Sequence, residues 1–383
     1  MTAFDVAVIG AGPAGTCAAI AAARAGMRTV LVERRRLPRS KVCGCCLSDA
    51  AVGALESLGT ATVLAGAQAL RTIRLSSGGR EVTVHRPAGL ALSRRELDAR
   101  LAARAAAEGV RVIDGAAAQV RRMGTVVLAG DGPEELRASC IVVADGLGGT
   151  SLDAVPGFPW KVGARSRIGI GAELAGGAIC CIPGEVRMHV LRSGYVGCVM
   201  LEDGALDVAA AVDPRALRAA GSPGAFACAA LGSAVRDAAA LQAAAWTGTP
   251  LLTRRRASVA APGILVAGDA AGYVEPFTGE GMGWAIMAGV AAGRHAARCA
   301  SDPDAWRAWP QAWRRLVRAP SIRCHLVSGA LRHPSLVAAA IRGGSFLPAV
   351  MSGVAGRIGR RPGTGAGPAA SDVQRLPQGA VRS

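Results

Sequence analysis

The sequence predicts an α/β protein with two lobes, one built on a parallel sheet covered by helices and one on an antiparallel sheet. The first 33 residues alternate strand, glycine turn, helix and strand, the pattern of a parallel crossover. Residues 163–212 instead contain short apolar runs separated by glycine-rich turns, which is typical of an antiparallel sheet. A buried strand followed by a helix returns at 264–299, so the parallel lobe is expected to be assembled from non-contiguous segments.

The length of the chain also favours two lobes. Its 383 residues are too many for one ordinary hydrophobic core. We expect residues 1–160 and 245–300 to form the parallel-sheet domain and residues 161–244 the antiparallel-sheet domain. Residues 301–355 are expected to form a helical C-terminal region. Residues 356–383 are rich in Gly, Pro and Arg, and we expect a disordered tail.

Local patterns define several elements. Ser93 and Glu96 have the spacing of a capping box, which predicts that a helix begins there and continues to Ala107. Gly78-Gly79 separates two β-branched runs and predicts a hairpin. The remaining expected segments are helices over 48–58 and 214–244, and hairpin strands over 73–76 and 81–84.

Composition narrows the class of protein. Hydrophobic residues make up 51% of the chain and charged residues 19%, as in folded globular proteins. The formal net charge is +17, which is compatible with nucleic acid, an anionic membrane or an anionic cofactor. Aromatic residues, which stack on nucleic-acid bases, make up only 3%, and no recognition module is found. We therefore expect no nucleic-acid partner.

The start of the chain and its cysteines predict a cytoplasmic location. Residues 1–9 run into an expected strand without a basic leader or a cleavage site. The 11 cysteines therefore indicate free thiols in a reducing compartment. No apolar run reaches the ~20 residues that span a bilayer. Residues 305–361 contain ten Arg and no Asp or Glu. This predicts either peripheral contact with an anionic membrane or a helical cap with an Arg-coated face.

A glycine-rich motif lies between the first strand and the first helix. Residues 10–15 read Gly-Ala-Gly-Pro-Ala-Gly, and Glu33 ends the next strand. Gly10 permits a tight turn, Gly12 lets the backbone approach a pyrophosphate, and Gly15 allows close packing of helix on sheet. The helix N-terminus favours phosphate, and Glu33 can accept hydrogen bonds from a ribose. The motif predicts a Rossmann-like dinucleotide site.

A second motif distinguishes between dinucleotides. Residues 263–272 read as a buried strand that ends in Gly268-Asp269, and residues 276–283 form a glycine-containing loop before a helix. In this pair of motifs the chain resembles the para-hydroxybenzoate hydroxylase and geranylgeranyl reductase superfamily of FAD-dependent oxidoreductases. The resemblance covers residues 4–300. It implies that Asp269 holds the ribityl and pyrophosphate region of FAD, and that the loop lies beside the isoalloxazine.

Two further segments agree with this resemblance. Asp145 follows a strand in an Asp-Gly motif like that of the superfamily, and Arg94 starts an Arg-x-x-Leu-Asp helix from which it can reach the flavin phosphates. The alternative for Arg94 is a surface residue on a helix. The residues expected to bind FAD are Gly10, Gly12, Pro13, Ala14, Gly15, Glu33, Arg34, Arg94, Asp145, Gly268, Asp269, Gly279, Gly281 and Met282.

The branch of the superfamily is indicated by residues 41–44. Lys-Val-Cys-Gly at these positions, and glycine rather than histidine at Gly272, resemble the geranylgeranyl reductases. The Trp-x-Trp-x-Ile-Pro motif of flavin halogenases is absent, which argues against halogenation. The resemblance places Cys43 near the flavin, as a candidate for touching substrate or tuning the ring.

The cysteine cluster at 43–46 leaves alternatives open. Cys43, Cys45 and Cys46 could simply be small loop residues near the flavin. Cys-x-Cys-Cys is not a zinc-ribbon spacing, so we expect no metal. A disulfide is not expected in the cytosol. His189 lies on a β-run and either faces the substrate cavity or is satisfied within the sheet.

Two reactions remain open at this stage. The first is flavin-mediated reduction or dehydrogenation of a hydrophobic small molecule, as in geranylgeranyl reductases. The second is hydroxylation of an aromatic or polyketide-like substrate by an FAD monooxygenase, which requires a dry pocket. Only one Gly-x-Gly-x-x-Gly follows a strand, so we expect NAD(P)H to bind transiently or an external reductase to deliver electrons. The two other hypotheses are a protein that binds flavin without using it in a redox reaction, and a flavoprotein that associates with nucleic acid.

Overall fold

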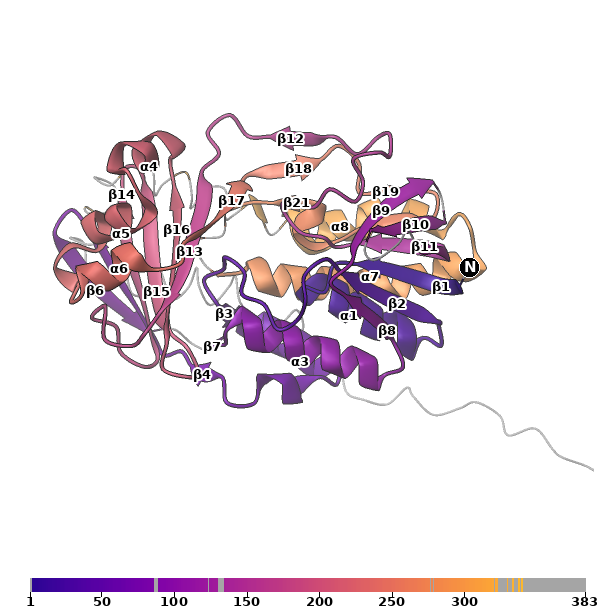
Figure 1. Cartoon of the computed structure of the whole chain (residues 1–383), viewed down its shortest axis with the longest axis horizontal. Helices are drawn as coiled ribbons and strands as arrows, with labels where there is room; N and C mark the ends of the chain where they lie inside the picture. The colour runs from indigo at the N-terminus through magenta and orange to yellow at the C-terminus, as the bar shows by residue number, and fades with distance from the viewer. Residues whose placement is uncertain are drawn as a thin grey trace, which may run out of the picture.

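The computed structural model describes residues 2–319 except 86–88, 123, 130–133, 276 and 278, together with residues 321, 322, 329, 333, 337 and 339. Two lobes lie side by side, each around its own sheet (Figure 1). One lobe has a largely parallel sheet with helices packed on it, and the other has a largely antiparallel sheet. This confirms the predicted fold class.

The parallel sheet explains why the first and middle parts of the chain share one lobe. Its strands run in the order β19-β20-β11-β1-β2-β8, with a hairpin of β9 and β10 attached to β11. The central strands are buried, as expected for parallel strands inside a lobe. The strand bounds are β1 (Thr2–Ile9), β2 (Thr29–Glu33), β8 (Arg111–Asp114), β9 (Ala117–Arg122), β10 (Thr125–Ala129), β11 (Glu134–Val143), β19 (Ala260–Ala261) and β20 (Ile264–Val266).

Two helices of this lobe, α1 and α7, touch backbone to backbone. Gly289 and Gly293 of α7 lie so close to the carbonyl oxygens of Ala14 and Ala18 in α1 that a Cβ at either glycine would overlap them. This close contact packs the first half of α1 against the middle of α7. The helices of the lobe are α1 (Pro13–Arg24), α2 (Asp49–Ser57), α3 (Arg94–Ala107) and α7 (Gly281–Ser301), with a 3-10 turn η1 (Ala61–Leu64).

The second lobe is a seven-stranded sheet in the order β17-β13-β16-β15-β14-β5-β6. Helices cover one face of it, and the other face is turned toward the parallel lobe. The strands are β5 (Thr72–Ser77), β6 (Arg80–His85), β13 (Ile168–Leu174), β14 (Glu185–Leu191), β15 (Gly194–Met200), β16 (Leu206–Val212) and β17 (Thr247–Leu251).

The placement of β5, β6 and β17 corrects the expected division of the chain. The hairpin forms as predicted, but it lies in the seven-stranded sheet rather than in the lobe of residues 1–160, because β5 pairs in parallel with β14. Likewise β17 pairs with β13, although residues 245–300 were assigned to the other lobe. Pairings between segments more than 70 residues apart leave no local pattern in the sequence.

The helix expected over 214–244 is three short helices. Gly221 at φ +80° and Gly232 at φ +53° interrupt the chain, and Pro223 begins the second helix. Positive φ ends a right-handed helix, so the glycines are the physical reason for the breaks. The pieces are α4 (Pro214–Ala220), α5 (Pro223–Leu231), 3-10 turn η2 (Gly232–Ala234) and α6 (Ala238–Ala243).

Two three-stranded sheets join the lobes. In the first, the order is β3-β7-β4, and in the second it is β12-β18-β21. Their bounds are β3 (Cys46–Ser48), β4 (Gln68–Ala69), β7 (Gly89–Ala91), β12 (Trp160–Val162), β18 (Arg254–Arg256) and β21 (Gly272–Tyr273), and the 3-10 turn η3 (Gly268–Ala270) leads into β21.

The C-terminal region begins as predicted with helical turns. These are η4 (Ala305–Ala308), α8 (Trp309–Trp313) and the π-helix η5 (Arg314–Arg318). Trp309 is fully buried, and its indole N–H donates to the carbonyl of Val266 at 3.0 Å, which anchors this region to the parallel sheet. Most of segment 305–361 and the whole of tail 356–383 lie outside the described residues. Within the part of the chain that the structure describes, no helix combines the length and apolar character needed to cross a membrane.

Candidate flavin and substrate site

The glycine turn at 10–15 has the geometry of a phosphate-binding turn. Gly10 has φ +102°, and a Cβ there would overlap the carbonyl of Ala144, so only glycine suits the position. A Cβ at Gly15 would overlap the carbonyl of Gly10, because helix α1 folds directly onto the turn. At Gly12 the nearest group to a Cβ is Nη2 of Arg94 at 3.6 Å, which leaves the backbone open to a ligand.

The N-terminus of α1 is suited to an anion. Gly12 is its N-cap and supplies no side-chain cap, and Pro13 occupies the first helical turn. The uncapped N–H groups and the helix dipole therefore favour negative charge at this point. Gly268, at φ +59°, packs against Ala14, so the Gly-Asp turn of the second motif lies beside the same helix end.

Glu33 belongs to a buried network of two acids and two arginines. It accepts hydrogen bonds from the backbone N–H of Ala11 at 2.9 Å and from Nη2 of Arg39 at 3.0 Å. Arg39 also bonds Asp98 through Nη1 at 2.8 Å, and Arg94 bonds Asp98 through Nε at 3.0 Å and Nη2 at 2.7 Å. Although burial opposes ionisation, the hydrogen bond from Arg39 holds the pKa of Glu33 below its usual value.

The two aspartates of the motifs have different surroundings. Asp145 accepts bonds from the backbone N–H of Ser151 at 3.0 Å and from its Oγ at 2.6 Å, so it caps the turn after β11. Asp269 instead lies within the field of two cations, Lys41 and Arg94. Burial raises the pKa of both aspartates, and the two cations act against this at Asp269.

Lys41 is a further cation near these residues. A Cβ at Gly146 would lie 2.7 Å from its Nζ, so the ammonium is close to the turn that follows β11. Desolvation lowers the pKa of Lys41, the positive charge of Arg94 adds to this, and Asp269 opposes it. A cation between Asp269 and the glycine turn has the position and charge to bind phosphate.

The loop before α7 meets the cysteine loop. Gly279 has φ +74°, and a Cβ there would lie 3.5 Å from Cβ of Cys46. Gly281 opens helix α7, and Met282 is buried in the core behind it. Arg34, the remaining predicted residue, follows β2 and is exposed at the outer end of the site.

The cysteine loop itself carries an unusual thiol pair. The Cys45 thiol donates a hydrogen bond to Cys43, and Arg94 donates another, so the pKa of Cys43 falls to about 6 although burial acts against this. The pKa of Cys45 is raised, because its hydrogen bond to Cys43 and its burial both favour the protonated form. Burial also raises the pKa of Asp207, which is hydrogen-bonded to Cys45.

Comparison with known proteins assigns the family. The family described as FAD dependent oxidoreductase matches residues 5–189. Menaquinone reductase of Mycobacterium tuberculosis is 32% identical over 335 residues, which cover 80% of this chain and 78% of that protein. The chain belongs to the FAD-dependent oxidoreductases. This confirms the family predicted from the motifs and that the protein is an enzyme of the geranylgeranyl reductase and menaquinone reductase type.

Other relatives of this flavoprotein agree. Digeranylgeranylglycerophospholipid reductase 2 of Methanopyrus kandleri is 27% identical over 325 residues, covering 79% of this chain and 78% of that protein. A geranylgeranyl bacteriochlorophyll reductase-like protein of Thermoplasma acidophilum has the same fold, with a TM-score of 0.73 at 18% identity over 89% of this chain and 91% of that one. A flavin-dependent brominase also shares the fold, with a TM-score of 0.79 at 16% identity over 94% of each chain.

The residues of the site fit the FAD that the family requires. The open backbone at Gly12 and the uncapped start of α1 suit the pyrophosphate, and Glu33 retains acceptor capacity for a ribose because a carboxylate has about four acceptor positions. Lys41, Arg94 and Asp269 interact electrostatically with one another, and Arg94 lies beside Gly12 of this turn. Bound FAD would supply hydride chemistry, while these groups hold and orient it. The role of each individual residue stays a prediction.

The face of the seven-stranded sheet next to the flavin site of the oxidoreductase is mainly apolar. Tyr195 packs edge-on against Phe277, with ring centroids 5.1 Å apart. A buried ion pair of 2.8 Å between Arg167 and Glu275 ties the sheet to the loop that precedes α7. Leu147, from the loop after β11, packs in the same cluster, and the other apolar residues of the cluster on or beside the strands of this sheet are Leu75, Val186, Met188, Val190, Val199, Leu201, Ala211 and Leu252.

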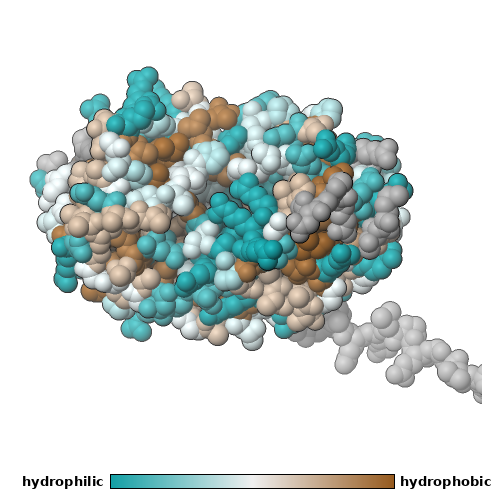
Figure 2. Space-filling model, viewed as in Figure 1, coloured by the Kyte–Doolittle hydropathy of each residue, from teal (hydrophilic) through white to brown (hydrophobic). Residues whose placement is uncertain are grey.

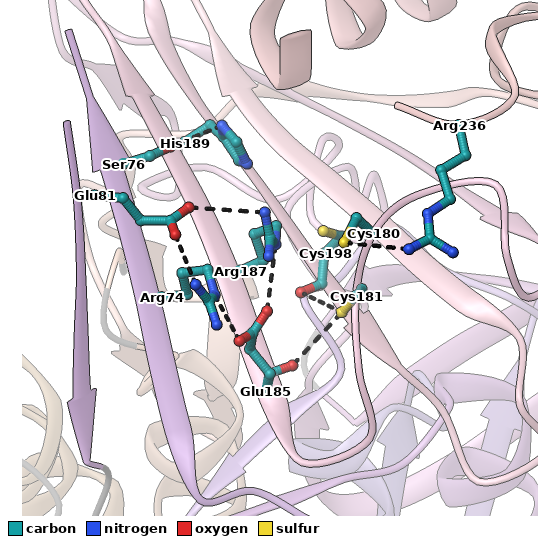
Figure 3. A network of polar contacts seen from close by, with 10 residues as sticks. All are labelled: Arg74, Ser76, Glu81, Cys180, Cys181, Glu185, Arg187, His189, Cys198 and Arg236. Atoms are coloured by element: carbon teal, nitrogen blue, oxygen red, sulfur yellow. Dashed lines mark hydrogen bonds and ion pairs between the residues drawn. The ribbon is translucent and has the colours of Figure 1, made fainter. Parts of the chain in front are cut away.

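The opposite face of this sheet carries a polar network in the flavoprotein. Figure 3 shows Arg74, Glu81, Glu185 and Arg187 linked by ion pairs at the β6 edge. His189 bonds Ser76 at 2.8 Å. Because Val186, Met188 and Val190 alternate with them and face the flavin lobe, Arg187 and His189 point away from the substrate side. His189 therefore lies within the sheet and away from the substrate side, bonded to Ser76 through Nδ1, while its buried Nε2 has no hydrogen-bond partner among the described residues.

Several residues of the site lie outside the motifs. Arg39 and Asp207 were not expected, Asp98 was noted only as the last residue of the Arg-x-x-Leu-Asp motif, and Lys41 only as part of a resemblance. Asp207 had a visible signal, since it is an acid within the apolar strand of residues 206–212. Arg39 had none, because its partners are 6 and 59 residues away. In the described part of the chain, no group of three or more His, Cys, Asp or Glu could hold a metal ion.

The visible face of the flavoprotein is mixed in hydropathy. Figure 2 shows hydrophilic and hydrophobic residues interspersed over both lobes, with an apolar strip at the upper left. The large apolar residues exposed among the described residues are Val162, Ile182, Leu251 and Ile322.

Proposed function

We propose that this flavoprotein reduces carbon–carbon double bonds in the isoprenoid chain of a lipid, with a prenylated quinone as the substrate. Relatives named for menaquinone and for digeranylgeranylglycerophospholipid support the proposal. Menaquinone and digeranylgeranyl lipids have different head groups but share an unsaturated isoprenoid chain. The more similar relatives are those named for menaquinone, which favours a quinone head group.

The observation that carries the proposal is the apolar face of the seven-stranded sheet opposite the flavin site. Val186, Met188 and Val190 of β14 and Tyr195 of β15 lie on the side of the sheet that meets the cysteine loop. A long hydrocarbon chain gains about 0.8 kcal/mol for each buried CH₂ group, so such a surface favours an isoprenoid over a polar metabolite.

Saturation of a double bond also requires a proton, and Asp207 is the candidate acid. It lies on β16 and is 5% exposed. Burial raises the pKa of Asp207 well above the usual value of a carboxyl group, and the negative charges of Cys43 and Glu173 add to this, so its surroundings favour the protonated form. Its hydrogen bond to Cys45 connects it to the thiol pair at the flavin site. We therefore assign Asp207 the role of proton reservoir in the proposed reaction.

The experiment is a single-turnover reaction under anaerobic conditions. Chemically reduced holoprotein is mixed with menaquinone bearing an unsaturated side chain, and the extracted lipid is analysed by mass spectrometry. We expect a gain of two hydrogen atoms per turnover in the isoprenoid chain. Gly12→Val, which is expected to lack FAD, is the control that excludes reduction by the chemical reductant. Absence of any gain with prenylated quinones and digeranylgeranyl lipids alike would refute the proposal.

The same preparation tests the alternative of a monooxygenase. Reduced holoprotein is mixed with oxygenated buffer in a stopped-flow instrument. We expect direct reoxidation in the presence and absence of menaquinone. A transient flavin–oxygen adduct, together with oxygen incorporated into an aromatic or polyketide-like substrate, would replace the reductase proposal.

The electron donor and the cellular location remain proposals. We propose that NAD(P)H binds transiently or that an external reductase serves, and bleaching of the flavin absorbance on anaerobic addition of NADH or NADPH separates the two. We also propose a cytoplasmic protein that binds a membrane peripherally through residues 305–361, which lie largely outside the described residues. Co-sedimentation of the full chain with anionic but not neutral vesicles is the expected result.

A further inference from the structure

The thiols of Cys43 and Cys45 interact in the cysteine loop, where Cys45 has an uncommon backbone conformation. Cys45 has φ +48° and is the one non-glycine residue with positive φ among the described residues. Side chains with a Cβ disfavour this conformation, so it persists only where surrounding contacts hold it. Here the carbonyl of Cys45 accepts a hydrogen bond from Leu92 at 3.1 Å, and the turn directs its thiol back to Cys43.

The two thiols have complementary protonation states. The hydrogen bonds that Cys43 receives from the thiol and the backbone N–H of Cys45, and the charge of Arg94, favour its thiolate form, with a pKa of about 6. Cys45 keeps its proton, because its pKa is raised by the same hydrogen bond and by burial. A thiolate beside a protonated thiol is the arrangement that redox-active dithiols require.

The pair also lies where it can meet the flavin ring. Arg94, which contacts Cys43, approaches the Gly12 position of the phosphate turn. Cys46, the next residue after the pair, touches Gly279 in the loop before α7. Cys43 is half-buried and Cys45 is buried, so the Cys43 side chain is the more accessible of the two.

We propose that Cys43 and Cys45 form a redox-active dithiol that exchanges two electrons with the bound flavin. In the oxidative direction the S–H bond of Cys45 breaks and an Sγ–Sγ bond forms between the two cysteines. The two electrons and the proton of Cys45 pass to oxidised FAD, which becomes the reduced anion. The reverse step restores the Cys43 thiolate and the Cys45 thiol. No further oxidant or reductant is needed for this exchange.

Two other thiol pairs in the described residues serve as internal references. Cys181 and Cys198 are in side-chain contact on the helix-covered face of the seven-stranded sheet, and Cys140 and Cys299 are in contact inside the parallel lobe. Neither pair contacts a residue of the glycine turn or of the loop before α7. A two-electron exchange with the flavin is therefore assigned to the Cys43–Cys45 pair.

The test is an anaerobic reductive titration of the oxidised holoprotein with dithionite. We expect wild type to take up four electrons per flavin, and Cys43→Ser and Cys45→Ser to take up two fewer. Cys228→Ser, a half-buried thiol on α5 away from the site, is the matched control and should behave as wild type. Uptake that is equal in wild type and both site variants would overturn the proposal.

A second measurement uses wild type alone, in case the site variants fail to fold or to bind FAD. Oxidised and reduced protein are alkylated and digested, and the peptide containing both cysteines is weighed. We expect this peptide to be unalkylated and two hydrogen atoms lighter in the oxidised sample only. Two alkylated thiols in both samples would overturn the proposal. Because the test needs bound flavin but no lipid, its outcome is independent of the proposed reduction of isoprenoids.

A spectroscopic signature separates a redox pair from a merely structural one. A thiolate against oxidised flavin produces a long-wavelength charge-transfer absorbance. We expect this absorbance to appear in two-electron-reduced wild type as the pH rises through about 6, and to be lost in Cys43→Ser. Its absence at every pH in folded, flavin-bound wild type would place the sulfur away from the ring and overturn the proposal.

Discussion

The three glycines of the phosphate turn have separate physical roles, and single substitutions distinguish them. Gly12→Val places a side chain where the backbone is open to a pyrophosphate, and nothing but Arg94 is close. We expect folded protein with sharply reduced flavin content. Gly15→Ala drives a Cβ into the carbonyl of Gly10, so we expect loss of folded protein as well. Flavin absorbance and thermal unfolding of the purified variants measure the two effects. Full flavin occupancy in Gly12→Val and Glu33→Ala would remove the assignment of the site.

Replacing each of the two aspartates of the motifs by alanine is expected to have a different effect on FAD retention and on stability. Asp145 bonds only to its own turn through Ser151, whereas Asp269 lies among cations of the site. We expect Asp269→Ala to weaken FAD retention more than Asp145→Ala. Asp145→Ala should instead lower stability by about 1–3 kcal/mol, because the backbone N–H of Ser151 loses its acceptor. Equal and normal FAD retention in both variants would contradict this.

The acidity of Cys43 is testable without any substrate. Because its folded-state pKa is about 6, we expect its alkylation by iodoacetamide in the apoprotein to reach a plateau above that pH. An ordinary thiol, with a pKa of about 8.5, would still accelerate above neutral pH. In Cys45→Ala the pH midpoint should rise, since the main hydrogen bond to the thiolate is removed. A midpoint that stays near that of an ordinary thiol in wild type would contradict the pair as described.

At the residue scale, the sequence predicted what local motifs specify. The glycine turn, Glu33 and the Gly268-Asp269 turn are contiguous patterns, and the structure brings them together at one helix end. Arg39 and Asp207 could not be predicted in the same way. Their roles depend on contacts with side chains that are far away in the sequence, and such contacts cannot be inferred from the spacing of residues along the chain.

At the scale of elements, the contact between α1 and α7 leaves no room for side chains larger than glycine at two positions of α7. Gly289→Ala and Gly293→Ala each force a methyl group into the backbone of α1. We expect each to destabilise the protein by about 1–3 kcal/mol, the usual cost of overpacking. Arg294→Ala, on the exposed side of the same helix, is the control and should change stability by less than about 0.5 kcal/mol. Urea denaturation followed by circular dichroism gives these values. Unchanged stability in both glycine variants would show that the helices can move apart freely.

Helices and strands were predicted correctly where the sequence signal lies within a few neighbouring residues. The capping residue Ser93 accepts from the N–H of Glu96, as the motif requires. Glu96 itself bonds Arg100 instead, and Glu202 takes the N–H of Ser93, so the box is completed by a distant residue. The predicted hairpin of β5 and β6 is present. The sheet to which it belongs could not be predicted, because β5 pairs in parallel with the distant strand β14, and no local sequence pattern records that pairing.

At the scale of the whole molecule, the two lobes are joined through a buried ion pair. Arg167 and Glu275 are 1% and 2% exposed and lie on opposite sides of the junction. We expect Arg167→Met to destabilise the protein by about 3–5 kcal/mol, because it leaves a buried carboxylate without this partner. The double variant Arg167→Met with Glu275→Leu should cost less than the single one. Thermal unfolding of both variants decides this, and a double variant as unstable as the sum of its singles would argue against coupling.

The parallel pairing of β5 with β14 constrains how this protein can be cut and recombined. The two strands are 113 residues apart, and the chain passes through the other lobe between them. Such long-range pairing must wait for most of the chain, which slows folding. A gene fragment that ends at residue 162 would carry β5 and β6 without β14, leaving the outer edge of an apolar strand open to aggregation. The cofactor half of this enzyme is therefore not a module that can be transplanted by cutting the chain once.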